Sequence, residues 1–292
     1  TVVGIFVGIL RLSKNWIVAK LMSIYIEGFR NVPVLLWIVM IFALLTELTP
    51  APKAFKGDNP EASMLFFESV AVTNRGTYLP MPVMGDGAYW IIIGLCFSVI
   101  AIIYFSRYSK ALKEKTGKGL PIFWISFCAL IIPCFLLYFL LGKPITFNYP
   151  YLKGFNFKDG IHLRNSFLAL TFALAVYTSA FIGEIVRSGI LAISKGQTEA
   201  ASALGLRPNK IMSLIILPQA LRVIVPPMIS QYLNLTKNSS LAIAVGYMDV
   251  RGTLGGITLN QTGRELESML LLMGFYLAVS LLTSSVINYF NR

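Results

Sequence analysis

The sequence has little charge and few of the side chains that carry catalytic or metal chemistry. Asp, Glu, Lys and Arg make up only 13% of its 292 residues, and there are three cysteines and one histidine. His162 has no nucleophile motif near it, so Ser-His-Asp catalysis and a histidine-based metal site have no support. Cys96, Cys128 and Cys134 lie in apolar runs, where an odd cysteine count indicates small packing residues instead of disulfides or metal ligands.

A nucleotide-binding loop is also missing. No stretch fits the pattern G-x-x-x-x-G-K-[ST], and "TGKGLP" at 116–121 lacks its spacing. We therefore expect this chain to hold no cofactor of its own and not to hydrolyse ATP. By itself it is predicted not to be an enzyme.

Apolar residues are what the sequence has in abundance. They form 56% of the chain, and the mean hydropathy is +0.70. Soluble domains carry about 25% charged residues, so this composition indicates a membrane protein. A spanning helix needs about 20 largely apolar residues. The candidate spans are Val32–Leu48, Tyr89–Phe105, Phe123–Leu141, Ser166–Val186 and Leu266–Tyr289.

Two further apolar segments are irregular. Positive charge follows Thr1–Leu10 instead of preceding it, so this segment does not fit a signal peptide. We interpret it as the tail of a spanning helix whose beginning precedes this chain. Val223–Met248 is apolar at both ends and is interrupted by "NLTKNSS". Together these segments predict an all-α fold, a polytopic transmembrane protein.

The basic residues predict the orientation. If "RYSKALKEKTGKG" at 107–119 is cytoplasmic and the sides alternate from there, the inner segments carry 15 of the 25 Lys and Arg residues and four acidic residues. The net charge of +12 then divides into +11 inside and +1 outside, as expected because cytoplasmic loops collect Lys and Arg. We predict a cytoplasmic C-terminus and an outer loop at Thr49–Gly87. The charge needs no nucleic-acid partner to explain it.

"EAASALGLRPNKIMSLIILPQALR" (Glu199–Arg222) is a basic, alanine-rich stretch between two candidate spans, on the predicted cytoplasmic side. Strong helix formers at Gln197–Leu204 predict a short helix, and Gly205 follows at a position where a positive φ is accessible. Pro208 suits the first turn of a second helix, which Pro218 should kink or end. From these residues the stretch is either an amphipathic helix on lipid headgroups or a surface whose small-residue face admits a partner protein.

The motif spacing favours a partner. Glu199-Ala200-Ala201, Gly205, Ile215 and Leu217-Pro218 have the spacing of the EAA signature, and on this motif the chain resembles the permease subunits of ABC importers. In that family this loop docks on a separate ATPase subunit. The resemblance therefore assigns ATPase coupling to Glu199, Ala200, Ala201, Leu204 and Gly205.

Other segments are similar to narrower groups of these permeases. "YIEGFRNVPVLL" (25–36), "GEIVRSGILAISKGQTEAASALGL" (183–206) and "LPQALRVIVPP" (217–227) resemble the polar amino acid branch, whereas "QYLNLTKNSSLAIAVGY" (231–247) and "TLNQTG" (258–263) resemble the general L-amino-acid permeases. The resemblance implies a type I importer core with two additional spans. Its parts are N-terminal core spans at 1–48, an outer loop with the two inserted spans and their loops at 49–165, and a C-terminal core with the coupling loop at 166–292.

The resemblance also implies a function. The chain is expected to be a multi-pass permease subunit of the bacterial inner membrane that couples ATPase motion to alternating access for polar or general L-amino acids. The implied partners are a homologous second permease subunit, two ABC ATPase subunits that bind the ATP, a periplasmic amino-acid-binding protein and the membrane lipids. The alternatives are an importer permease for another solute, such as methionine or a phosphonate, and an ion-coupled secondary transporter. The last predicts acidic residues buried within spans, whereas the acids here lie in loops or at span ends.

The polar interruption of Val223–Met248 is the candidate solute path. Polar backbone at membrane depth is tolerated only where it is buried or lines a cavity, and a lysine at the bilayer centre costs about 2.5–3.5 kcal/mol. We expect a broken helix in which Lys237, Ser239 and Ser240 meet a carboxylate. In the alternative, Lys237 extends to the outer headgroups and the polar residues cap two half-helices. The predicted path residues are Asn234, Thr236, Lys237, Asn238, Ser239 and Ser240.

Two charged pairs have simpler interpretations. Glu184 and Arg187 lie three residues apart at the inner end of a span, which favours a local ion pair over a gating role. Asp249 and Arg251, just beyond the predicted path, are interpreted as a pair on the outer surface.

Overall fold

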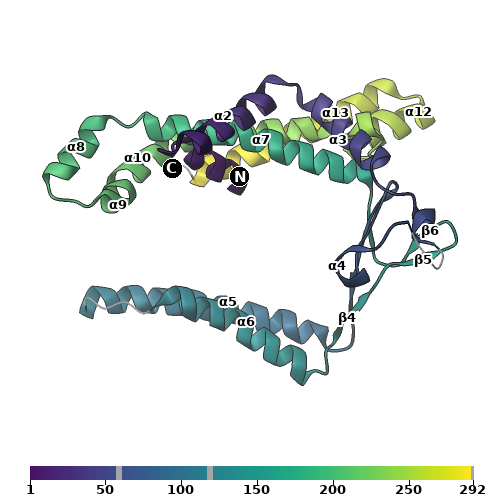
Figure 1. The fold of residues 1–292 in the computed structure, drawn as a ribbon, viewed down its shortest axis with the longest axis horizontal. Helices are drawn as coiled ribbons and strands as arrows, with labels where there is room; N and C mark the ends of the chain where they lie inside the picture. Colours follow the sequence, from purple (N-terminus) through teal and green to yellow (C-terminus); the bar gives the residue numbers. More distant parts are fainter. Residues whose placement is uncertain (57–60, 117–120, 291–292) are drawn as a thin grey trace. The chain divides into compact units, whose positions relative to one another are not determined.

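The computed structural model describes residues 1–56, 61–116 and 121–290. Most of these residues are helical, and five helices are long and apolar enough to cross a membrane, or six if one bent pair forms a single span (Figure 1). The predicted helical, multi-pass fold is confirmed. The chain divides into two compact units, one made of Thr1–Pro50, Thr73–Gly76 and Leu163–Arg292, the other of Ala51–Val72 and Thr77–His162.

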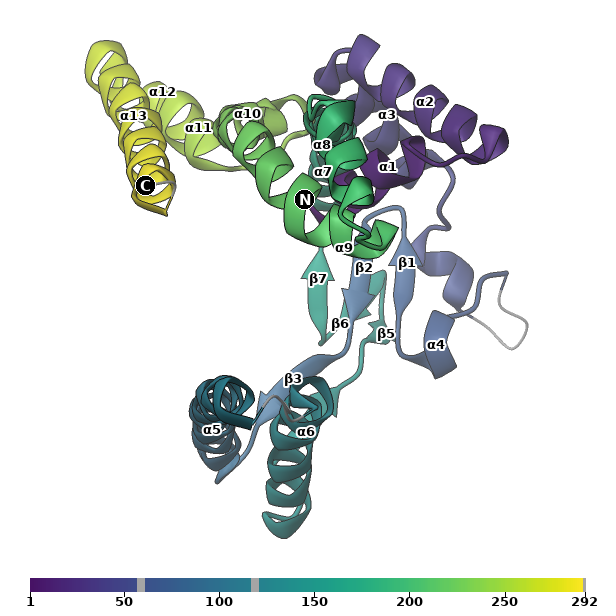
Figure 2. The same cartoon turned by 90° about the vertical axis from the view of Figure 1, so that its left-hand side faces the viewer.

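Helix α7 is the centre of the first unit. Helices α1, α2, α3 and α10 pack against it, and α13 packs against α10 (Figures 1 and 2). Ala169, Ala173 and Ala180 of α7 are fully buried, because small side chains let neighbouring helices approach. The bounds are Val2–Arg11 for α1, Trp16–Asn31 for α2, Val34–Glu47 for α3, Asn165–Leu191 for α7, Leu217–Asn238 for α10 and Glu265–Phe290 for α13.

Glycines set the packing of α1 on α7. A Cβ on Gly8 would lie 2.6 Å from the carbonyl oxygen of Gly183, and one on Gly4 would lie 2.7 Å from Ile182 Cβ. Gly4 and Gly8 thus form a G-x-x-x-G contact, in which missing side chains let two backbones approach. The N-terminal apolar run is a packed helix of the bundle.

Helices α2 and α3 meet at an angle of 103°. Val32, between them, is extended with φ −108° and ψ 132°, the conformation that a residue before proline prefers, and Pro33 precedes the first turn of α3. The predicted span Val32–Leu48 is therefore α3, and α2 is a separate helix before the bend. The bend leaves Arg30, near the end of α2, beside Phe181 of α7.

The first turn of α7 is held by a buried amide. Asn165 donates hydrogen bonds from Nδ2 to the carbonyl oxygens of Leu45 at 3.2 Å, Thr73 at 3.4 Å and Asn74 at 2.9 Å. These bonds join the start of α7 to the last turn of α3 and to the turn at Thr73–Gly76. A single buried side chain thus satisfies carbonyls of two distant segments.

Short helices connect α7 to α10 and α10 to α13. Gly246 and Gly263, both in the left-handed region, follow the 3-10 helix and α12. The bounds are Lys195–Ala203 for α8, Pro208–Ile211 for α9, Met212–Ile216 and Thr253–Thr258 for two π-helical turns, Ser239–Val245 for the 3-10 helix, Val250–Gly252 for α11 and Leu259–Thr262 for α12.

The second unit contains a helical hairpin of α5 (Ala88–Thr116) and α6 (Ile122–Leu140), which pack against each other. The prediction of a basic loop at Ser106–Leu120 is wrong for the residues up to Thr116, because α5 continues through them. Lys, Ala, Leu and Glu in "SKALKEK" are strong helix formers, so the helix extends past its apolar part.

All three cysteines lie on this hairpin. All three are free thiols in the structure. Cys96 on α5 and Cys128 on α6 are exposed and Cys134 is partly buried, so the packing role predicted for the first two is wrong.

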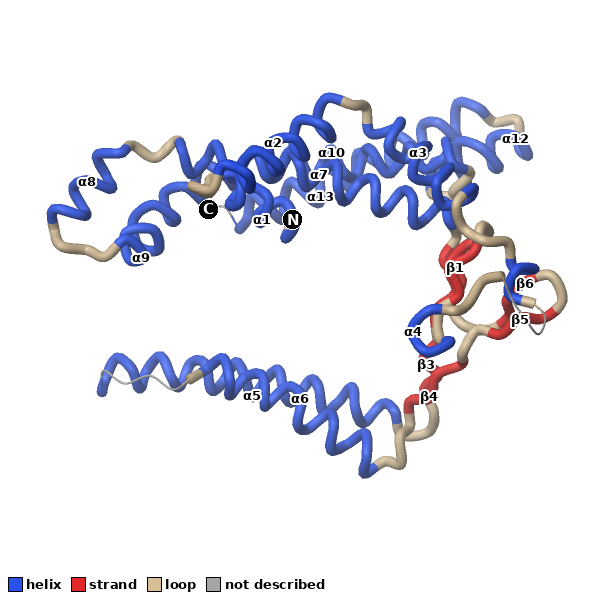
Figure 3. The backbone as a smooth tube through the Cα atoms, viewed as in Figure 1, coloured by secondary structure: helices blue, strands red, loops and turns tan. Residues whose placement is uncertain are grey.

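The segments on either side of the hairpin, predicted as loops, contain short strands (Figure 3). β3 pairs antiparallel with β4 and β5 with β6, and a third sheet has the order β1-β2-β7. Threonine, valine, isoleucine and aromatic residues in these stretches favour strands. The bounds are Ala71–Thr73 for β1, Gly76–Leu79 for β2, Met81–Met84 for β3, Ile145–Asn148 for β4, Tyr151–Lys153 for β5, Asn156–Lys158 for β6 and Ile161–Leu163 for β7.

Aromatic packing holds this strand-rich part together. The rings of Tyr78 and Phe55 both contact that of Phe157, with centroids 5.4 Å and 5.3 Å from it. His162 stacks on Tyr78 at 4.4 Å between centroids, which gives the histidine a packing role. The same part holds the 3-10 helix Pro52–Phe55 and the short segment α4, Leu65–Glu68.

Candidate functional site

The predicted coupling stretch forms two helices joined by a tight turn. α8 ends at Ala203, and Gly205 has φ +76°, in the left-handed region that glycine adopts without strain. The N–H of Leu206 donates to the carbonyl of Ala201 at 3.2 Å, and the N–H of Gly205 donates to that of Ser202 at 2.9 Å. These two bonds define a Schellman motif. The predicted cap at Gly205 is confirmed.

The second helix also begins where predicted, with Pro208 in the first turn of α9. Pro218 does not end it. The helix widens into the π-helical turn Met212–Ile216 and continues as α10. Pro218 has no N–H to donate to the carbonyl of Leu214, and the π-helical turn accommodates the missing bond. The helix is therefore distorted before Pro218 but continues from α9 into α10.

Four of the five residues predicted for ATPase coupling are exposed. Glu199, Ala200 and Gly205 lie on the surface, and Leu204 exposes 81% of its area. Ala201 is buried, because α8 packs against α9 and the π-helical turn. Because Ala201 is buried, only part of the predicted small-residue face is accessible to a partner protein. The turn presents one apolar side chain and one carboxylate on a fixed backbone.

The predicted break at Asn234–Ser240 is wrong. α10 runs without interruption to Asn238 and passes into the 3-10 helix only at Ser239. Three hydroxyls of this stretch are satisfied within the helix itself, because they donate to backbone carbonyls about one turn earlier. The bonds run from Thr236 Oγ1 to Tyr232 at 3.1 Å, from Ser239 Oγ to Thr236 at 2.7 Å and from Ser240 Oγ to Lys237 at 2.7 Å.

Two of the six predicted path residues line a cavity between α7 and α10. Asn234 and Asn238 form part of its α10 wall together with Gln231, and the volume is about 260 Å³. Lys237 is exposed and is not among the residues that line this cavity. Amide side chains both donate and accept hydrogen bonds, so the cavity suits a polar solute.

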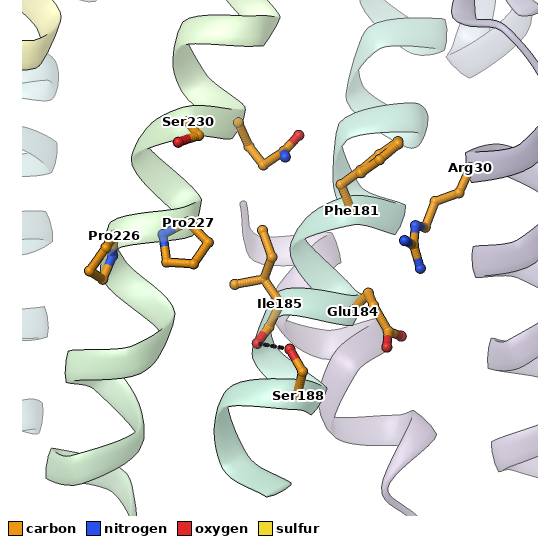
Figure 4. A pocket seen from close by; sticks show the side chains of 9 residues that line it. Arg30, Phe181, Glu184, Ile185, Ser188, Pro226, Pro227 and Ser230 are labelled. Carbon is orange, nitrogen blue, oxygen red and sulfur yellow. Dashed lines mark hydrogen bonds between the residues drawn. The ribbon is translucent and has the colours of Figure 1, made fainter. Parts of the chain in front are cut away.

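A larger cavity of about 600 Å³ shares Phe181 and Gln231 with the first (Figure 4). Its walls come from α2, α7 and α10. Pro226 and Pro227 form part of the α10 wall, and because proline has no N–H, the carbonyls one turn earlier lose their helical donors. The two cavities together follow the interface of α7 and α10.

The same two helices are in close contact nearer the Leu191 end of α7. A Cβ on Gly189 would lie 2.3 Å from Ile224 Cγ1. Ile224 and Ala220 are buried there with Ile182 and Val186 of α7. Small residues bring the helices together at this end, and the cavities open further along the interface.

Glu184, which lines the larger cavity on α7, is the centre of a charged cluster. Glu184 accepts hydrogen bonds from Arg11 of α1 and, at 2.6 Å, from Arg187 one turn along α7. Arg11 also lies 3.5 Å from Glu27 of α2. The predicted Glu184–Arg187 pair is confirmed, and Arg11 extends it to three helices.

The predicted pair of Asp249 and Arg251 does not form. Asp249 Oδ1 accepts a hydrogen bond from the N–H of Gly252 at 2.9 Å and caps α11, whereas Arg251 donates to the carbonyl of Ser240 at 3.1 Å. Within the described residues no ion pair joins the two. Both side chains stabilise the backbone after α10.

Nothing in the local sequence singles out Arg30, which also lines the larger cavity. Its guanidinium carbon lies 5.3 Å from the centre of the Phe181 ring, and its Nε is buried without a hydrogen-bond partner. In the sequence this arginine is one of several inner basic residues that orient the chain. Its place beside α7 depends on the bend between α2 and α3.

Comparison with known proteins places this multi-pass helical protein in a class of membrane transport components. Residues 116–292 match the family described as "Binding-protein-dependent transport system inner membrane component". The chain is 52% identical to the glutamate/glutamine/aspartate/asparagine transport system permease protein BztB of Rhodobacter capsulatus, over 97% of this chain and 72% of that protein. It is 40% identical to the general L-amino acid transport system permease protein AapQ of Rhizobium johnstonii, over 100% and 70%.

The chain therefore belongs to the binding-protein-dependent transport system inner membrane component family, and the predicted family is confirmed. A solved structure described as an amino acid ABC transporter with histidines has the same fold, with a TM-score of 0.53 at 18% identity, over 100% of this chain and 83% of that one.

Proposed function

We propose that this chain is the permease subunit of an ATP-driven importer for polar L-amino acids. The names of BztB and AapQ, to which it is similar over nearly its whole length, support an amino acid as the solute. The amides of Gln231, Asn234 and Asn238 in the smaller cavity support a polar solute. ATP hydrolysis belongs to separate subunits in this proposal.

The observation that carries the proposal is the connection between the coupling turn and the cavities. α8 and α9 link the Leu191 end of α7 to the start of α10, and the cavities lie between these same two helices. A force applied at Leu204 or Gly205 therefore acts directly on both cavity walls. Alternating access requires such a mechanical link between the ATPase subunits and the solute path.

The exposed surfaces fit the proposed partners. Leu204 and Glu199 on the turn offer an apolar and an acidic contact to an ATPase subunit, and a pair of permeases would engage two of them. Most of the described side chains of α13 are exposed, which leaves much of that helix available to a homologous second permease or to lipid. An external binding protein would deliver the solute on the opposite side.

The proposed orientation follows the charge count. The α8–α9 turn lies in the cytoplasm with the C-terminus, because the inner segments collect most of the Lys and Arg residues. The strand-rich segments then lie outside. In a bacterium with two membranes this is the inner membrane.

The proposed solute path follows the two cavities. Asn234 and Asn238 contact the solute, and the neighbouring Thr236, Ser239 and Ser240 shape the end of α10 through their backbone bonds. The competing prediction, made from the sequence, is that Lys237 binds the carboxylate of the amino acid. The two predictions differ in how substitution of Lys237 or of Asn238 should change uptake.

The proposal is tested with the complex purified together with its native partners and placed in proteoliposomes. Uptake of L-glutamate, L-glutamine, L-alanine, L-methionine and a phosphonate is measured with and without internal ATP. We expect ATP-dependent uptake of polar amino acids. Uptake of only methionine or the phosphonate would identify a different importer, and uptake driven by an ion gradient without ATP would identify a secondary transporter.

A further inference from the structure

Arg30 is a charged side chain that lines the larger cavity. In the part of the chain that the structure describes, no salt bridge includes Arg30, and its buried Nε has no hydrogen-bond partner. Its contact is the face of Phe181, at 5.3 Å. An aromatic face holds a guanidinium in position by a cation–π interaction and leaves its N–H groups free.

The nearest acid on the cavity wall is already engaged. Glu184 accepts hydrogen bonds on Oε2 from Arg11 and on Oε1 from Arg187. Figure 4 shows Arg30 on the α2 side of the cavity, with Phe181 and Glu184 on the facing α7. Arg11 and Arg187 are balanced by Glu184 and Glu27, so the guanidinium of Arg30 leaves this group of side chains with a net positive charge.

Partly burying a cationic side chain such as Arg30 is costly unless it meets water or an opposite charge. We propose that Arg30 binds the carboxylate of the amino acid that occupies the larger cavity, and that this cavity consequently prefers acidic and neutral amino acids to basic ones. Guanidinium and carboxylate match as planar partners that form two parallel hydrogen bonds. The inference rests on the proposed function and specifies its substrate class.

The surroundings of Arg30 suit an amino acid in other respects. The volume of about 600 Å³ lies within the range of small-molecule sites. Ser230 and Gln231 face it from α10 and offer a hydroxyl and an amide to the polar groups of the solute. Ile185 and the two prolines supply apolar contacts for a side chain.

The test uses the complex with its native partners in lipid nanodiscs, without the external binding protein, so that binding to the permease is measured directly. The probes are L-glutamine and L-glutaminamide, which differ in the α-carboxylate. Unmodified complex should bind glutamine about tenfold or more tightly than the amide, because a charge-assisted hydrogen bond contributes on that order.

Arg30→Met should abolish this preference and bring the ratio of the two affinities close to one. Lys20→Met is the matched control, since it removes an exposed cation from the same helix outside the cavity, and it should keep the original ratio. Arg30→Lys keeps the charge without the planar pair and should give an intermediate ratio. A ratio is insensitive to the fraction of folded protein, so a partly unfolded variant still gives an answer.

The outcomes separate the inference from the proposed function. An unchanged ratio in both Arg30 variants, in a complex that binds glutamine, would overturn the role of Arg30 and leave the importer assignment standing. A second consequence concerns selectivity, because Arg30→Met should also lose discrimination between L-glutamate and L-lysine. Equal binding of these two amino acids by the unmodified complex would contradict the charge argument. Binding of no amino acid by the unmodified complex, with or without the binding protein, would refute the proposed function.

Discussion

Glu184 on α7 and Arg11 on α1 form an ion pair between residues 173 positions apart in the sequence. Arg187 takes the second carboxylate oxygen at 2.6 Å, so one glutamate holds two arginines. This arrangement fastens α1 to the central helix next to the larger cavity. Arg30, on the facing helix, forms no salt bridge among the described residues.

We expect Glu184→Gln to destabilise the bundle. Its removal leaves Arg187, 29% exposed at its side chain, without a carboxylate, and leaves Arg11, 16% exposed, with only the contact to Glu27 at 3.5 Å. The loss of unfolding free energy should be about 1–3 kcal/mol, between the values for exposed and for buried pairs. Thermal unfolding of the purified complex measures it. Glu27→Gln is the control, because Glu27 is 52% exposed and has one contact at 3.5 Å, so its loss should cost less than about 0.5 kcal/mol. Equal effects of the two substitutions would contradict the assignment.

The turn at Gly205 is expected to transmit force only while its backbone stays left-handed. Gly205→Val places a β-branched residue at φ +76° and should cost about 1–2 kcal/mol at the turn, so uptake should fall although the chain still inserts. Gly196→Val adds the same side chain to α8, also in open space but at a helical φ. ATP-driven uptake is compared in the two assembled complexes. Parental uptake by assembled Gly205→Val would refute force transmission through this turn.

Two neighbouring residues of α10 distinguish a solute path along the cavities from one in which Lys237 binds the carboxylate of the solute. Asn238 lines the smaller cavity, whereas Lys237 is exposed. If the path follows the cavities, Asn238→Leu should reduce uptake by removing a hydrogen-bonding amide, and Lys237→Met should change it little. Uptake is measured at saturating binding protein, so that the permease step limits the rate. The reverse pattern would favour the sequence-based assignment of Lys237 to the carboxylate.

Packing between Gly189 and Ile224 should couple the two helices that carry the cavities. Gly189→Ala inserts a methyl group 2.3 Å from Ile224 Cγ1 and should cost about 1–3 kcal/mol by overpacking. Adding Ile224→Ala creates the missing space, so the double variant should be more stable than the sum of the single effects by at least about 0.5 kcal/mol. Thermal unfolding of the three variants gives this coupling energy. Strict additivity would show that the residues do not touch.

The orientation can be tested by labelling single cysteines in a cysteine-free background. Phe67 is fully exposed in the strand-rich part, so Phe67→Cys should react with an impermeant maleimide in intact spheroplasts. Ser202→Cys, on the exposed surface of α8, should react only after lysis. The opposite pattern would invert the topology that the basic residues predict.

Local properties of the sequence were enough to predict the spans and the coupling turn. An apolar run of sufficient length forms a helix in a bilayer because every backbone group must be satisfied within it. Gly205 and Pro208 likewise act through their own φ values and hydrogen-bonding groups, so the cap and the second helix were predicted correctly. The strands beside the hairpin were missed because three or four residues carry too short a pattern to separate a strand from a loop.

The continuity of α10 shows where local reasoning fails. Six polar residues near its end indicated a break, but serine and threonine hydroxyls can bond carbonyls of the preceding turn, and a helix that provides these bonds need not break. Composition cannot distinguish this outcome from an unwound segment, because the same side chains serve both.

The sequence by itself determined the class of protein and, to within one or two, the number of apolar spans. It also determined the position of the turn at Gly205, which we propose contacts the ATPase subunit. Only the tertiary structure decided the cavities, the fit of Gly4 and Gly8 against α7, and the positions of Arg11 and Arg30. The physical reason is that each of these depends on residues far apart in the chain. The charge of Arg30 becomes informative only when the bend at Pro33 sets it beside Phe181 and the neighbouring glutamate is already bound to two other arginines.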